Sequence, residues 1–270
     1  MPELPEVETV VRTLRENTPS LLDRTIQSVE ILWPREVQGI DAAQFTEHVT
    51  ASRVSAVRRH GKNIMIDLNK RGYRGTMFVH LKMSGRLNVV AERDAHTKHA
   101  RVIWHLDQHL ALRFDDARKF GRVWLPDDPV QILSKLGPDA LMANLQDFTQ
   151  ALRKRRGALK PILLDQRFIA GIGNIYADES LHRAKLHPQR IAATLTSTDA
   201  ERLFSTVQTV LQEGIQANGA SFDWVYPEGN FQENFRVYGQ TGKPCNECGT
   251  EIIRILVGQR STHYCPQCQI

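Results

Sequence analysis

Cysteine is scarce in this 270-residue chain: it has only four, and all of them lie after residue 244. The rest of the chain must therefore fold without disulfides. Long hydrophobic runs are absent too, since nothing approaches the roughly 20 apolar residues of a membrane-spanning helix. The acidic start lacks the basic and apolar regions of a signal peptide. These absences predict a cytoplasmic protein with no membrane partner.

Low-complexity segments and internal repeats are also missing, and neither sign of charge dominates strongly. The formal net charge is +5, and the excess of basic residues is spread along the chain. This balance permits a polyanionic partner without proving one, so any phosphate-binding surface must be found from local clusters. A length of 270 residues with 41% hydrophobic side chains is enough for two domains with separate cores.

The four cysteines form two C-x2-C pairs separated by sixteen residues. This spacing is typical of a four-cysteine zinc site, and two matched pairs argue against redox-active pairs or disulfides. The intervening segment, GTEIIRILVGQRSTHY, reads as two short strands around a glycine, which predicts a β-hairpin zinc finger. Four sulfur ligands leave no open position for water, so one structural zinc ion is expected. The predicted ligands are Cys245, Cys248, Cys265 and Cys268.

The pattern of apolar residues divides the chain into regions of different fold class. Residues 5–17 have apolar positions at helical spacing, and residues 25–125 contain many short apolar or alternating runs typical of an antiparallel sandwich. Breaker-rich residues 126–145 predict a hinge, and helical patterns follow to about residue 218. We therefore expect an α+β protein in three domains. They are residues 1–135 with an amino-terminal helix and β-sandwich, 136–235 with helices and a loop, and 236–270 with the zinc finger.

Two neighbouring features of the helical region could serve nucleic-acid binding. The segment GIGN, ending at Asn174, lies between two helical patterns, where a glycine turn can present backbone N–H groups to phosphate. An ordinary glycine turn with an Asn N-cap is an equally good interpretation. The segment LRKRRGALK contains Arg155 and Lys160 in a basic cluster. Such clusters are usually solvated helix faces, but beside a phosphate-binding turn a nucleic-acid surface is favoured.

Two segments of the β-rich region, HLKMSGRL and FDDARKFGR, place bulky or cationic residues at strand ends. They contain Met83 in the first and Arg118 and Phe120 in the second. Methionine and phenylalanine are most often core residues. Together with a nucleic-acid surface, these side chains could instead be wedges that enter a base stack.

The first residues, MPELPEVET, raise a separate question. Pro5 and Glu6 suit the first turn of the expected helix, but that helix does not explain Pro2 or Glu3. Here the sequence resembles the bacterial formamidopyrimidine-DNA glycosylases along its whole length. MPELPEVET is similar to their amino-terminal signature, KHARV and ARKFG to their middle segments, GIGNIYADE to their helix–two-turn–helix, and VYGQTGKPCNECG with QRSTHYCPQC to their zinc finger. Leu4 favours the purine-lesion branch over the endonuclease VIII branch.

The resemblance implies a chemical role for the amino terminus. In this family the initiator methionine is removed and the amine of the next residue, here Pro2, is the nucleophile. A secondary amine can attack C1′ of the sugar and form a Schiff base. The resemblance implies that Glu3 is the general acid and base, that Lys62 contacts phosphate and assists β-elimination, and that Arg260 binds phosphate and assists δ-elimination. Glu6 is then a supporting carboxylate.

The resemblance also implies a partner, double-stranded DNA containing damaged bases, and a protein that works as a monomer, associated with the bacterial nucleoid when it acts on DNA. A damaged base must leave the stack before it can react. Met83, Arg118 and Phe120 match the residues that fill the resulting void, with Arg118 facing the orphaned cytosine. The remaining implied DNA contacts are His99, Arg155, Lys160 and Asn174.

Two departures from the family pattern concern specificity. The loop at residues 219–235 starts GASFDW, with Ser221, Phe222 and Trp224 in place of a GGTT-like start, and Gln240 stands where arginine is usual. The expected activity is excision of oxidised purines, namely 8-oxoguanine and formamidopyrimidines, followed by strand cleavage at the abasic site. One alternative is an endonuclease VIII-like enzyme for oxidised pyrimidines. Another is a non-catalytic zinc protein that binds damaged DNA, which would not need Pro2, Glu3 and Lys62 together.

Overall fold

The computed structural model describes residues 1–221 and 229–270. Within these residues the chain forms two compact units. The amino-terminal unit contains Met1, Pro2 and residues 6–135, and the carboxy-terminal unit contains Glu3, Leu4, Pro5 and residues 136–221 and 229–270. In the described residues, no helix has the length and apolar character needed to cross a membrane.

The first helix is α1 (Leu4–Glu16), whose residues from Glu6 onward belong to the amino-terminal unit. Val7, Val11 and Leu14 recur at helical spacing and are each about 1% exposed, so the valine face is buried as the sequence predicts. Glu6 lies in the first turn and Arg15 in the last, which suits the helix dipole. The expected helix is therefore confirmed, with its start one residue earlier.

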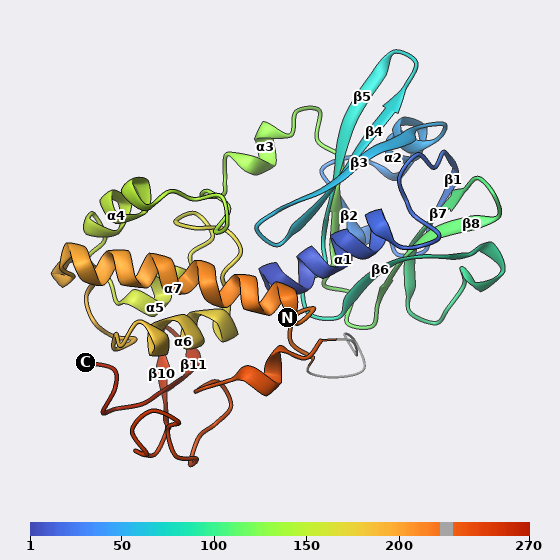
Figure 1. The fold of residues 1–270 in the computed structure, drawn as a ribbon. Helices are drawn as coiled ribbons and strands as arrows, with labels where there is room; N and C mark the ends of the chain where they lie inside the picture. The colour runs from blue at the N-terminus through green and yellow to red at the C-terminus, as the bar shows by residue number, and fades with distance from the viewer. Residues whose placement is uncertain (222–228) are drawn as a thin grey trace. The chain divides into compact units, whose positions relative to one another are not determined.

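Two sheets follow, and they form the predicted β-sandwich (Figure 1). The first has the order β1 (Ile26–Ile31), β7 (Ala100–Leu106), β8 (Leu110–Asp116), β6 (Gly85–Ala91). The second has the order β2 (Val37–Gln38), β9 (Arg122–Trp124), β5 (Tyr73–His80), β4 (Asn63–Lys70), β3 (Arg53–His60). Neighbouring strands are antiparallel except β2 and β9, which are parallel.

The alternating residues of these strands meet in a closed apolar core, because successive side chains on a strand point to opposite faces. Trp104 and Phe114, from β7 and β8, are fully buried in it. The shorter elements of this unit are α2 (Ala42–Val49), α3 (Val130–Leu133) and two 3-10 turns, Pro34–Glu36 and Glu92–Asp94. Helix α3 lies within the segment expected to be a hinge.

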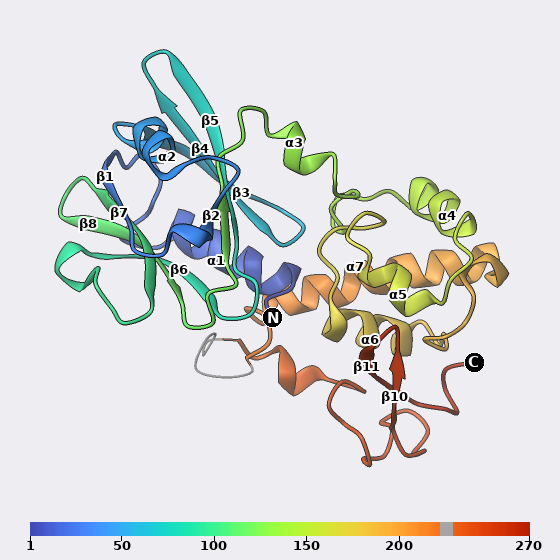
Figure 2. The same cartoon turned by 180° about the vertical axis from the view of Figure 1, so that it is seen from behind.

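The carboxy-terminal unit is helical, as the sequence predicts. Its helices are α4 (Leu145–Arg153), α5 (Leu159–Leu164), α6 (Asn174–Arg183) and α7 (Ser197–Gln216), with 3-10 turns at Ala192–Thr194 and Phe231–Asn234. Figures 1 and 2 both show α6 beside the long helix α7, with the hairpin strands next to α6. Thr196 and Asp199 form a capping box that starts α7. Phe222 and Trp224 of the divergent loop lie outside the described residues.

The last element is the predicted hairpin, β10 (Ile253–Val257) and β11 (Arg260–Tyr264). Val257 pairs with Arg260, which leaves a two-residue turn of Gly258 and Gln259. Both have positive φ, 54° and 61°, as a type I′ turn requires. The turn places Arg260 at the exposed start of β11.

Candidate active site and nucleic-acid interface

The carboxylate of Glu3 is bound by the start of helix α6. Its Oε1 accepts a hydrogen bond from the N–H of Ile175 at 3.0 Å, and Oε2 accepts one from Tyr176 at 3.4 Å. Helix amino termini favour negative charge because their first N–H groups have no partner within the helix. Glu3 is only 3% exposed. The helix therefore fixes the position of this carboxylate although it lies about 170 residues earlier in the chain.

The glycines of the GIGN segment explain why Glu3 can approach so closely. A Cβ at Gly173 would lie 2.2 Å from Cδ of Glu3, and a Cβ at Gly171 would lie 2.5 Å from a methyl carbon of Leu4. The N–H of Leu4 also donates to the carbonyl of Gly171 at 3.0 Å. One interpretation of this turn needs correction: the N-cap residue is Gly173 rather than Asn174. The amides of Ile175 and Tyr176, which follow the turn, bind the carboxylate of Glu3.

Pro2 and Lys62 lie in the amino-terminal unit and are both buried. Pro2 follows Met1, which is 52% exposed, so the residue that the predicted mechanism requires to be removed faces solvent. Lys62 lies in the turn between β3 and β4. Arg59 supports this turn, because its Nε lies 2.9 Å from Oε2 of Glu8 and its Nη1 donates to the carbonyl of Gly61 at 3.0 Å. Arg59 and Glu8 are not predicted from the sequence, because their pairing depends on the fold.

A neutral histidine lies near Lys62. His80 ends β5, and its partner in β4 is Asn63, the residue after Lys62. Burial lowers the pKa of His80 to about 3, and the charges of Lys82 and Lys62 act in the same direction. Nδ1 of His80 accepts a hydrogen bond from the N–H of Lys82 at 3.0 Å. Its imidazole therefore adds no positive charge beside Lys62 at neutral pH. Glu6, the predicted supporting carboxylate, is 3% exposed.

Lys160 occupies a different environment from the one predicted. Its side chain is fully buried, and Nζ lies 2.6 Å from Oδ1 of Asp178, which is also buried. Nζ further donates to the carbonyl of Ser261 and to Oγ1 of Thr262, both at 2.8 Å. Lys160 therefore joins α5 and α6 to strand β11. In this structure the side chain has no exposed surface, and its ammonium group is bound by protein acceptors.

Asn174 shares this support, since its Nδ2 donates to the same Ser261 carbonyl at 3.0 Å. Its neighbours on α6 hold the rest of the zinc-finger segment. Asp178 accepts from the N–H of His263 at 2.9 Å, and buried Glu179 accepts from the N–H groups of Val237 at 3.0 Å and Tyr238 at 2.9 Å. Asp178 and Glu179 are not predicted as site residues from the sequence. The only sequence signal is their position as adjacent acids in a helix that is otherwise largely buried.

The predicted wedge residues are exposed. Met83 is 43% exposed and Phe120 is 46% exposed, so neither belongs to the core. The guanidinium carbon of Arg118 lies 5.1 Å from the centre of the Phe120 ring, in a cation–π contact. His99 is half-buried just before β7. Arg155 lies 5.6 Å over the Phe168 ring and 3.5 Å from Asp165, at the edge of the carboxy-terminal unit's core.

The four cysteines converge as the zinc prediction requires. Their Sγ atoms all lie within 4.8 Å of one another, with Cys248 and Cys265 3.4 Å apart and Cys245 and Cys268 3.9 Å apart. Tetrahedral Zn–S bonds of about 2.3 Å place sulfurs about 3.8 Å from one another, so the cluster fits one zinc ion. Nε2 of buried His182 lies 3.5 Å from Cys245 Sγ, where it can donate to a zinc-bound thiolate.

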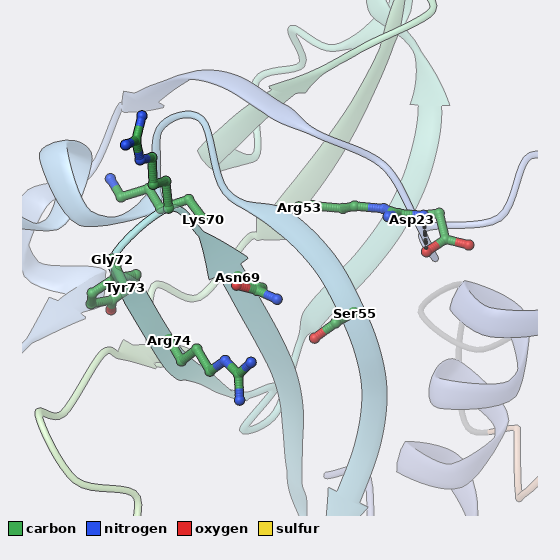
Figure 3. Close-up of a pocket in the computed structure, with 9 residues that line it drawn as sticks. Asp23, Arg53, Ser55, Asn69, Lys70, Gly72, Tyr73 and Arg74 are labelled. Carbon is green, nitrogen blue, oxygen red and sulfur yellow. Dashed lines mark ion pairs between the residues drawn. The ribbon is translucent and has the colours of Figure 1, made fainter.

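One hollow of about 690 Å³ has none of the predicted site residues in its lining (Figure 3). It surrounds the turn between β4 and β5, at the opposite end of β4 from the turn that contains Lys62. Arg53 pairs with Asp23 there at 2.8 Å. The other lining residues are Ser55, Asn69, Lys70, Arg71, Gly72, Tyr73 and Arg74. No predicted catalytic or DNA-contact side chain borders this hollow, so it is not the candidate active site.

Comparison with known proteins identifies the family of this chain. Three family models match in order: the formamidopyrimidine-DNA glycosylase N-terminal domain at residues 1–123, the H2TH domain of the same enzymes at residues 136–224, and a zinc finger found in FPG and IleRS at residues 242–270. The chain belongs to the formamidopyrimidine-DNA glycosylase family. Its α+β architecture and its zinc-finger cysteines are those of the family.

Individual relatives extend over the whole chain. The formamidopyrimidine-DNA glycosylase of Pelotomaculum thermopropionicum is 43% identical over all of this chain and 99% of its own length, and that of Heliobacterium modesticaldum is 42% identical over the full length of both. Among solved structures, Lactococcus lactis Fpg bound to DNA with an abasic site is 32% identical, with a TM-score of 0.89 over 99% of both chains. MutM in complex with DNA containing carbocyclic 8-oxo-G has a TM-score of 0.90 at 33% identity, over 99% of both chains.

Proposed function

We propose that this protein is a base-excision-repair DNA glycosylase that removes oxidised purines from duplex DNA and then cleaves the strand at the abasic site. The observation that carries the proposal is the carboxylate of Glu3, held on the start of α6 directly after the residue predicted to be the nucleophile. A non-catalytic DNA-binding protein would not need a glycine turn shaped around this carboxylate. The DNA substrate implies that the protein acts at the nucleoid.

In the proposed reaction, removal of Met1 exposes the secondary amine of Pro2. The unperturbed pKa of an α-amino group is about 8, so a useful fraction is neutral at physiological pH. The amine nitrogen attacks C1′ of the damaged nucleotide, the glycosidic bond breaks, and the base leaves with that electron pair and a proton. Glu3 moves the protons that open the sugar and yield the iminium. Elimination then breaks the 3′ and 5′ C–O bonds, with Lys62 and Arg260 as the proposed phosphate-binding residues.

Each unit contains residues that we propose to contact DNA. In the amino-terminal unit they are His99, Met83, Arg118 and Phe120, whose exposed apolar members suit insertion into a base stack. In the carboxy-terminal unit they are Arg155 and Arg260. Zinc, when bound by the four cysteines, supplies structural stability to the hairpin and takes no part in the reaction.

Borohydride trapping tests this proposal, because reduction of the iminium joins the protein covalently to DNA. Protein lacking Met1, verified by intact mass, is incubated with a duplex containing 8-oxoguanine opposite cytosine. Pro2→Gly tests the nucleophile, and protein retaining Met1 is the matched control. Trapping only of the processed wild type supports the terminal-amine mechanism and the purine substrate. Failure to trap on 8-oxoguanine and on abasic duplexes would refute the enzyme assignment and leave a DNA-binding module.

A second substrate class belongs in the same experiment. The 33% identical Lactococcus lactis Fpg has been solved with DNA containing an oxidised pyrimidine. A duplex with an oxidised pyrimidine is therefore the informative comparison. Faster trapping on that duplex than on 8-oxoguanine would keep the lyase chemistry and assign the protein to oxidised pyrimidines.

A further inference from the structure

One buried carboxylate organises the loop that carries two of the proposed wedge residues. Asp116 ends β8 and is fully buried. Its Oδ2 accepts hydrogen bonds from the N–H of Phe120 at 2.8 Å and of Gly121 at 2.7 Å, and its Oδ1 accepts one from the N–H of Arg118 at 3.1 Å. The backbone of Arg118 and Phe120 is therefore wrapped around a single side chain.

The same carboxylate reaches the loop that carries the third wedge residue. The hydroxyl of Ser84, the residue after Met83, donates to Oδ1 of Asp116 and accepts from the N–H of Arg118 at 3.1 Å. Gly85, which follows, pairs directly with Asp116 across strands β6 and β8. The two wedge-bearing loops are 35 residues apart in sequence and share this one anchor.

The backbone of Asp116 adds a third connection. Its N–H donates to the carbonyl of His99 at 2.9 Å, and its carbonyl accepts from Nε of Arg101 at 2.8 Å. His99 is another proposed DNA-contact residue. Four of the proposed contacts in the amino-terminal unit, all except Lys62, are thus positioned around Asp116.

An aspartate is needed here because the surrounding groups are all donors. Three backbone N–H groups and one hydroxyl converge on its two oxygens, and only a carboxylate offers acceptors on both sides. An asparagine would turn an NH2 group toward at least one of these donors and leave it without a partner, which is costly in a buried site. A Cβ at Gly121 would lie 2.4 Å from the Phe114 ring, so the loop also lies tightly against the core.

This support matters because Met83 and Phe120 are large apolar side chains exposed to solvent. Without a fixed backbone, these side chains would lower their free energy by folding back onto other apolar surface and leaving water. We propose that Asp116 is a positioning residue that holds Met83, Arg118 and Phe120 as one rigid wedge, so that lesion recognition in duplex DNA depends on its carboxylate. This inference rests on the proposed function. It adds that the wedge is preorganised by a residue that itself touches no DNA.

The test compares Asp116→Asn with Asp115→Asn in protein lacking Met1. Asp115 is the matched control, because this neighbouring carboxylate pairs with Arg113 at 2.6 Å and accepts from Thr97 at 2.6 Å instead of binding the wedge loops. The first readout is single-turnover excision of 8-oxoguanine from a duplex. The second is borohydride trapping on a single-stranded abasic oligonucleotide, where no base stack has to be opened.

Asp116→Asn should lower duplex excision by about 10- to 100-fold, as expected for loss of a hydrogen bond to a charged group. It should leave trapping on the single strand within about threefold of wild type, because the wedge is not needed there. Asp115→Asn should leave both rates within about threefold of wild type. Ser84→Ala, which removes only the link to the Met83 loop, should give an intermediate loss on the duplex.

If Asp116→Asn lowers duplex excision and single-strand trapping by the same factor, Asp116 is merely structural and the inference is overturned. Duplex excision at the wild-type rate by both Asp116→Asn and Ser84→Ala would also overturn it. Fluorescence of 2-aminopurine beside the lesion measures opening of the base stack without any covalent step. Asp116→Asn should reduce this signal on binding. If the wild type opens the stack but traps nothing, the proposed function fails while the inference stands; if Asp116→Asn opens the stack as the wild type does, the inference fails.

Discussion

Replacement of Lys160 by methionine distinguishes a DNA contact from a structural role. Methionine keeps most of the length of the side chain and removes its charge. In the folded protein, Nζ of Lys160 lies 2.6 Å from Oδ1 of Asp178, and both side chains are fully buried. The substitution leaves the Asp178 carboxylate buried with the N–H and the imidazole of His263 but without the lysine ammonium.

The expected cost follows from this geometry. Removing one partner of a buried ion pair typically costs about 3–5 kcal/mol, because the remaining charge cannot recover its hydration. The carbonyl of Ser261 and the hydroxyl of Thr262 also lose a donor. Both belong to β11, so the loss should concentrate in the hairpin. Amide hydrogen exchange of β10 and β11 should accelerate by roughly two to three orders of magnitude, since about 1.4 kcal/mol corresponds to a factor of ten.

Hydrogen exchange followed by mass spectrometry, on zinc-loaded protein, measures this effect. Lys154→Met is the matched control, since Lys154 is exposed at the end of α4, and it should leave hairpin exchange unchanged. Lys160→Met combined with Asp178→Asn should recover at least half of the lost protection, because no charge is then left unpaired. A structural role for Lys160 is refuted if Lys160→Met leaves hairpin exchange unchanged but weakens DNA binding and lowers its salt dependence by about one phosphate contact.

Three further predictions concern other parts of the molecule. Gly173→Ala places a methyl group 2.2 Å from Cδ of Glu3. Borohydride trapping should therefore fall by at least about tenfold, while zinc content stays unchanged. Normal trapping by this variant would contradict the proposed positioning of Glu3. Burial raises the pKa of Glu36 from 4.5 to about 7, with Asp116 adding to the shift and Arg122, Arg101 and Lys119 opposing it. Between these two pH values the folded state holds a proton that the unfolded state has lost, so the free energy of unfolding falls as pH rises from 5 to 8. Glu36→Gln should remove about 3 kcal/mol of that fall, measured by urea titrations at several pH values. If the pH dependence of the free energy of unfolding is the same in Glu36→Gln as in the wild type, the raised pKa of Glu36 is contradicted. Metal analysis should find one zinc ion per chain. Cys265→Ser should abolish zinc binding and the protection of the hairpin amides from hydrogen exchange. Zinc retained by this variant would exclude the four-cysteine site.

The sequence by itself determined the features that depend on local patterns and on spacing. The valine periodicity predicts α1, alternating runs predict the strands, and two C-x2-C pairs predict a cluster whose four sulfurs do lie within 4.8 Å of one another. Four ordered motifs were enough to indicate the family. These signals are readable because helix and strand periods and knuckle spacings involve residues close together in the chain.

Only the tertiary structure decided how distant polar groups are paired. The basic residue Lys160 looks like a phosphate ligand in sequence, yet the fold buries it against Asp178. The GIGN turn looks like a phosphate site, yet the amides of Ile175 and Tyr176 directly after it bind Glu3. Asp116 carries no signal of its importance until three loops converge on it. A buried charge or N–H group takes whichever partner the fold brings within about 3 Å, and no local pattern of residues records that choice.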